Sequence, residues 1–167
     1  MIKQLAGNFN LNESDARNAV SQLLPALNQG ISKNIKQENG LEMLLGALSR
    51  GNHQKYVEQP DHLGSEETIR DGNAILGHIL GNKETSRRVA GHAAEKTGLD
   101  SAVLKKMLPV VATVAMGFLS KQSSGSGITG GRKQAPSQAM GFLSSLLDAD
   151  NDGSVVDDLL GFAKKLF

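Results

Sequence analysis

The stretch LPVVATVAMGFL, residues 108–119, is the most apolar in the chain and decides the fold. Crossing a bilayer takes about 20 apolar residues. This run is shorter and contains Pro109, Thr113 and Gly117. The sequence therefore predicts the core helix of a soluble protein, with Asp100 as the residue that caps its start.

On both sides of this run, apolar residues recur at helical spacing, and no stretch alternates long enough to indicate a strand. Asn12 and Ser65 are suited to cap two of the helices. We expect Pro25 and Pro109 to lie at kinks or helix breaks, because proline removes an amide hydrogen bond. The sequence thus predicts an all-α fold with a compact body of about six helices.

The expected helices are separated by recognisable turn residues, with one longer loop among them. The loop covers residues 51–64, which include Pro60 and two histidines. The helices before the core run are expected near 12–35, 41–49, 65–80 and 84–96, the last ending at Gly98, a natural left-handed end residue.

Composition favours a globular protein and excludes several kinds of chemistry. The chain has 167 residues, a formal net charge of +1 and no cysteine. Disulfides and cysteine-ligated zinc are excluded, and no long-range field attracts nucleic acid. Without a signal peptide or a transmembrane segment in the sequence, we expect a cytoplasmic protein.

Residues 121–137 differ in composition from the rest, being rich in glycine and serine with little to bury. They predict a flexible linker between a helical domain at 1–120 and a helix–loop–helix at 138–167. The pentapeptide MGFLS occurs at 116–120 and again at 140–144. This repeated sequence is compatible with duplication of a helical unit or with convergence of short apolar helices.

Several motifs resemble those of one bacterial family. They are DGNAILGHILG at 71–81, Val89-Ala90, TGLD at 97–100, Met107-Leu108-Pro109, Met116-Gly117 and LDADNDGSVVDDLLG at 147–161. In these motifs the chain resembles the family called domain of unknown function 937, which includes the YidB-like proteins. The resemblance implies an all-α fold and no particular activity.

The tail carries the one motif with chemistry in it. Asp148, Asp150 and Asp152, followed by glycine, have the spacing of the first ligands of an EF-hand loop. A divalent cation needs several oxygens, which alternate carboxylates on a turning loop can supply. The remaining predicted ligands are the Ser154 carbonyl and Asp157 or Asp158. The sequence therefore predicts a calcium site.

The site departs from the usual loop, because Leu159 occupies the position of the bidentate glutamate. We therefore expect weak binding. The alternative is that Ser154 and Asp157 only cap the helix that is expected to follow the loop. Capping leaves the three alternating aspartates without an explanation, since no lysine or arginine lies near them in the sequence.

No motif indicates an enzyme. The four histidines lack the spacing of zinc ligands, and no serine lies in a nucleophile elbow. The segments 44–48 and 75–81 are rich in glycine and leucine, which suits close helix packing; binding of a partner helix or membrane surface is the alternative.

The predicted function is thus a non-enzymatic helical interaction module with a calcium-binding C-terminal loop. Its expected partner is an unidentified protein, and self-association is left open. No nucleic acid is expected from the scattered basic pairs. A peripheral membrane or nucleic-acid-associated protein is the alternative.

Overall fold

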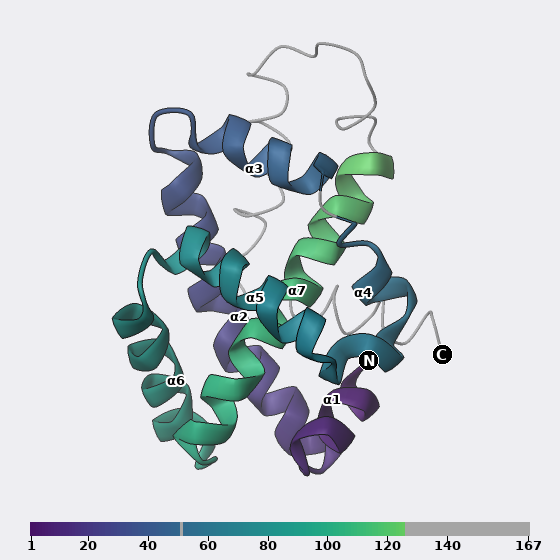
Figure 1. The fold of residues 1–167 in the computed structure, drawn as a ribbon. Coiled ribbons are helices and arrows are strands. Elements are labelled where there is room, and N and C mark those ends of the chain that lie inside the picture. Colours follow the sequence, from purple (N-terminus) through teal and green to yellow (C-terminus); the bar gives the residue numbers. More distant parts are fainter. Residues whose placement is uncertain (51, 126–167) are drawn as a thin grey trace.

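The computed structural model describes residues 1–50 and 52–125, and Figure 1 shows their arrangement. These residues contain helices and no strand, which confirms the predicted all-α fold. The elements are α1 (Ile2–Phe9), α2 (Glu13–Ile35), α3 (Gly40–Arg50), α4 (Lys55–Glu58), the 3₁₀-helix η1 (Pro60–Gly64), α5 (Glu66–Leu80), α6 (Lys83–Thr97) and α7 (Ser101–Gly125).

Helix α7 is the axis of the fold, running diagonally through the molecule in Figure 1. It packs against α1 through α6, and its residues from Met107 to Met116 are all buried. By length and composition alone, 101–122 could cross a membrane, but 72% of this apolar window is buried by the other helices. That burial is what the predicted core helix requires.

The predicted helix ends are confirmed by their caps. The Asn12 side chain accepts a hydrogen bond from the Asp15 amide at 2.8 Å, and the Ser65 hydroxyl accepts one from the Thr68 amide at 3.2 Å. Each cap satisfies an amide that would otherwise lack a partner in the first turn. Gly98 ends α6 in the left-handed conformation with φ of 73°.

The two prolines do not end their helices. Helix α2 continues through Pro25 and α7 through Pro109, so the expected alternative of a helix break is wrong at both positions. A proline deprives the carbonyl four residues earlier of its helical partner. Those carbonyls belong to Ser21, which is half-buried, and Lys105, which is exposed, so neither residue is sealed from water.

Three elements were not expected from the sequence. Helix α1 covers the first residues of the chain, and α4 and η1 lie within the expected loop 51–64. Leu5 of α1, Tyr56 of α4 and Leu63 of η1 are almost fully buried. These short elements owe their helical form to tertiary packing, which an isolated helix of this length would lack. At the other end, α7 extends to Gly125, within the segment expected as linker.

Among helices that do not follow one another in the chain, the closest approach at a glycine lies between α5 and α7. A Cβ atom on Gly72 would lie 2.1 Å from the carbonyl oxygen of Pro109 and 2.8 Å from its Cα. Only glycine fits there, because no side-chain atom can approach a backbone so closely. Helix α2 makes a similar contact with α5, since a Cβ on Gly30 would lie 2.6 Å from the Ile79 side chain.

Replacing Gly72 tests this packing. Gly72→Ala should lower the free energy of unfolding by about 1–3 kcal/mol, the usual cost of overpacking a core. Gly77→Ala on the same helix is the matched control: its Cβ meets nothing within 4 Å, so it should raise stability by about 0.5–1 kcal/mol. Urea unfolding followed by circular dichroism measures both. Equal stability of the two variants would contradict the close approach of α5 to α7.

Candidate functional site

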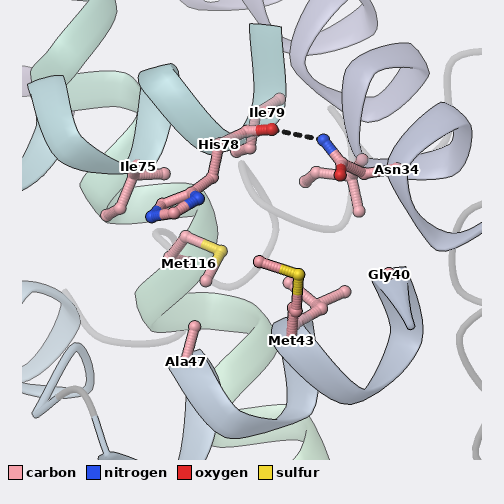
Figure 2. Close-up of a pocket in the computed structure, with 10 residues that line it drawn as sticks. Asn34, Gly40, Met43, Ala47, Ile75, His78, Ile79 and Met116 are labelled. Atoms are coloured by element: carbon pink, nitrogen blue, oxygen red, sulfur yellow. Dashed lines mark hydrogen bonds between the residues drawn. The ribbon is translucent and has the colours of Figure 1, made fainter. Parts of the chain in front are cut away.

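An apolar pocket opens between α2, α3 and α5 (Figure 2). Its volume is about 100 Å³. Helices α2, α3 and α5 form its walls, and Met116 contributes from α7. The lining residues are Ile31, Asn34, Gly40, Met43, Leu44, Ala47, Ile75, His78, Ile79 and Met116. Since most of these side chains are apolar, the pocket suits an apolar group and offers little to orient a polar substrate.

Two methionines from different helices point into this pocket (Figure 2). Met116 on α7 is buried, whereas the side chain of Met43 on α3 is 62% exposed. Methionine has an unbranched, polarisable side chain that adapts to different partners. An exposed methionine at the edge of an apolar pocket is therefore suited to cover whatever enters it.

A polar contact on the rim joins α2 to α5. The Asn34 side-chain amide donates a hydrogen bond to the backbone carbonyl of His78 (Figure 2). Gly40 begins α3 directly over Asn34, whose carbonyl lies where a Cβ of Gly40 would be. The hydrogen bond joins α2 to α5, and the glycine lets the start of α3 lie close to α2, so together they hold the walls of the pocket in place. His78 itself is exposed, so it is available at the rim.

A second, larger hollow lies beside the first, between α2, the end of α5 and α6. It has a volume of about 570 Å³ and shares Ile79 with the apolar pocket, so the two adjoin. Its lining residues are Ala26, Gln29, Gly30, Ser32, Lys33, Lys36, Ile79, Leu80, Thr85, Arg88 and Val89. We call this hollow the basic cleft.

The basic cleft contains three cations and no carboxylate. Lys33, Lys36 and Arg88 are all exposed, and none forms an ion pair with the residues that the structure describes. Three like charges on one concave surface attract anions. The apolar pocket and the basic cleft share Ile79, at the contact between α2 and α5, and we call the two hollows together the α2–α5 surface.

A cluster of titratable groups lies elsewhere, between α4 and α5. The buried Tyr56 hydroxyl donates a hydrogen bond to the Asp71 carboxylate, while Lys55 pairs with Glu67 at 2.6 Å and lies 4.9 Å from the Tyr56 ring centre. Burial, and then the bond to Asp71, raise the pKa of Tyr56 to about 12. Burial lowers the pKa of His53.

This cluster holds α4 against α5 and has no evident chemistry. A phenol with so high a pKa stays protonated and cannot act as a base near neutral pH. The Nδ1 atom of His53 is buried and has no hydrogen-bond partner among the described residues. It therefore has no contact that would make it the base of a nucleophile.

The predicted calcium ligands lie outside the described residues: Asp148, Asp150, Asp152, Ser154, Asp157 and Asp158. The same holds for the predicted helices on either side of that loop. Within 1–50 and 52–125, no group of three or more histidine or acidic residues could hold a metal ion. The calcium site stays a prediction from the sequence.

The α2–α5 surface was not predicted, but part of its signal is in the sequence. Part of its α3 wall and all of its α5 wall come from the two segments rich in glycine and leucine, 44–48 and 75–81. For these segments the sequence left two explanations, close helix packing and partner binding. The structure shows close packing, since Ile75, Leu76 and Ile79 are in the core. The basic cleft has no local signal, because its cations come from α2 and α6.

Comparison with known proteins identifies the family of the chain but no function. No curated protein and no solved structure matches the chain. Residues 1–122 match a family described as bacterial protein of unknown function (DUF937). This match covers α1 to α6 and nearly all of α7. It includes the family motifs between residues 71 and 117, whereas the motif at 147–161 lies outside it. The chain therefore belongs to this bacterial family of unknown function.

Proposed function

We propose that this protein is a non-enzymatic interaction module that binds a protein partner through the α2–α5 surface. The observation that carries the proposal is the adjacency of an apolar pocket with an exposed methionine to a cleft with three cations. Interfaces commonly centre on an apolar pocket surrounded by a polar rim. Fixed helices form this surface, so a partner needs little rearrangement of the module to bind.

The dimensions and charges of the surface indicate the partner's chemistry. A cavity of about 150 Å³ accepts benzene, so a pocket of about 100 Å³ accepts roughly one aliphatic side chain. The adjoining cleft favours carboxylates, since Lys33, Lys36 and Arg88 have no acidic neighbour in it. The expected partner segment therefore carries an apolar anchor next to acidic residues.

The alternative is association with an anionic membrane surface or with nucleic acid. The basic cleft is the observation that favours it, because phosphate groups bind lysine and arginine. The apolar pocket has no role in a phosphate contact, however. A peptide with an anchor and acids uses both halves of the α2–α5 surface, and we therefore prefer a protein partner.

Exchanging Met43 for aspartate tests the proposal. Met43→Asp should abolish recovery of the specific partner from bacterial extract by the immobilised protein, because it places a charge at the pocket edge. Ile69→Asp is the matched control, since Ile69 is also an exposed apolar residue, at 38%, and lies outside both hollows. Partner recovery is measured by quantitative mass spectrometry.

Both variants should remain folded, since both side chains are exposed, and circular dichroism checks this. Recovery of the same proteins by wild type, Met43→Asp and Ile69→Asp would contradict a role of the pocket in binding. Loss of the partner with both substitutions alike would place the binding surface elsewhere.

The second part of the proposal is that the loop 148–158 binds calcium. Its support is the alternating carboxylate spacing followed by Gly153. Mutual repulsion of five acids within eleven residues adds a reason, because a bound cation removes it. Calcium would then change the net charge of the tail.

Calcium titration by calorimetry tests this loop in the full chain. Binding should be weak, with a dissociation constant on the order of 10⁻⁵ to 10⁻³ M, because Leu159 replaces the bidentate glutamate. The double variant Asp148→Ala, Asp152→Ala should bind no calcium. Absence of heat in the wild type at millimolar calcium would leave the capping explanation of the loop. Equal binding by the double variant would place the site elsewhere.

A further inference from the structure

We propose that residues 139–152 of this chain are themselves an occupant of the α2–α5 surface, with the apolar part in the pocket and the aspartates in the basic cleft. The inference rests on the proposed function, because it takes the same surface as the binding site. In addition, the tail of the same chain regulates the α2–α5 surface, because a partner must displace the tail before it can bind.

The sequence of this segment has the order of chemistry that the surface requires. Residues 139–147, AMGFLSSLL, are mostly apolar, and Asp148, Asp150 and Asp152 follow directly. The two hollows likewise adjoin each other at Ile79. An apolar side chain in the pocket therefore leaves the aspartates close to the cleft.

The charges are complementary. No lysine or arginine occurs between Lys133 and Lys164, so the five aspartates of the tail have no basic neighbour in sequence. The cleft has the opposite charge, because Lys33, Lys36 and Arg88 line it and no carboxylate does. A single exposed ion pair contributes little to binding. Several pairs on one surface, together with the burial of an apolar anchor, stabilise the contact.

The chain is long enough and leaves the body in the right place. Helix α7 contributes Met116 to the pocket and ends nine residues later at Gly125, about 14 Å along the helix axis. The 17 residues from Gly125 to Phe142 can span up to about 55 Å when extended.

Attachment to the same chain favours this occupant over a second copy. A segment tethered by a short linker reaches an effective concentration in the millimolar range. Glycine and serine are frequent in the connecting residues 121–137. A chain of this composition can bring its two ends together at little cost in free energy. A weak contact is therefore populated within one chain at concentrations where two chains stay apart.

Calcium and the cleft compete for the same carboxylates. Asp148, Asp150 and Asp152 are the proposed calcium ligands, and a bound cation cancels most of their charge. Calcium should therefore weaken the contact between the tail and the basic cleft. The surface would then become available to a partner when calcium is present.

Paramagnetic broadening in the full chain tests the contact. The protein has no cysteine, so a nitroxide can be attached at Ser144→Cys alone. In protein with labelled methionine methyl groups, the signals of Met43 and Met116 should lose most of their intensity, because both line the pocket. Met1, which lines neither hollow and lies away from α3 in Figure 1, should keep its intensity. Broadening of Met140 reports that the nitroxide is attached.

Charge variants test the role of the cleft. The triple variant Lys33→Gln, Lys36→Gln, Arg88→Gln should restore the intensities of the pocket methionines. The control triple Arg70→Gln, Lys105→Gln, Lys106→Gln should not, since these exposed cations line neither hollow. Equal effects of the two triples would overturn the charge complementarity. Unchanged broadening in a chain saturated with calcium would overturn the competition.

Three results would overturn the contact itself. Unbroadened Met43 and Met116 signals would show that the tail is elsewhere. Broadening found only when nitroxide-bearing and isotope-labelled chains are mixed would assign the surface to a second copy. Sedimentation with phosphatidylglycerol vesicles or DNA that needs the cleft cations, without any broadening, would assign the cleft to external phosphates. In all three cases the Met43→Asp and Ile69→Asp comparison still tests the proposed function on its own.

Discussion

A single glycine of α5 lies directly against the backbone of α7, with the Pro109 carbonyl 2.1 Å from where a Cβ of Gly72 would be. Proteins pack helices at a separation that their side chains determine. With no side chain on Gly72, the two axes come closer, and α5 is fixed across the middle of α7. The apolar sequence of α7 makes this possible, since every residue from Met107 to Met116 is buried.

The α2–α5 surface follows from this arrangement. With α5 fixed on α7, a second glycine contact, Gly30 against Ile79, brings α2 against the C-terminal end of α5. The Asn34–His78 hydrogen bond then joins the pair, and Gly40 lets α3 turn back over it. The pocket is the space that remains above Met116. The basic cleft lies on the α6 side of the same crossing.

The sequence predicted the elements with strong periodicity and clear caps, such as the helix that Ser65 begins and the core helix of 108–119. It did not predict α1 or α4, because their few buried residues, such as Leu5 and Tyr56, become informative only once the body that covers them is known. A kink or a break was expected at Pro25, and the break is wrong, because packing of buried residues on both sides of the proline outweighs one lost hydrogen bond.

The candidate site was harder to predict for a related physical reason. The cations of the cleft are far apart in sequence, at 33–36 and 88, and become neighbours only through the α2–α5 crossing. Three exposed cations on two helices also look like ordinary solvated faces until the absence of a neighbouring carboxylate is seen. The calcium loop shows the opposite case: its ligands are local in sequence, so their spacing alone predicts a site.

Native-state hydrogen exchange tests most directly whether α7 is the axis on which the other helices depend. We predict that the amides of α7 from Leu104 to Met116 exchange only through global unfolding, with the same free energy as urea unfolding. The amides of α3 and α4 should exchange through smaller local openings. Exchange of the α7 amides at a lower free energy than those of α2 or α6 would contradict this prediction. In that case another pair of helices would form the stable core.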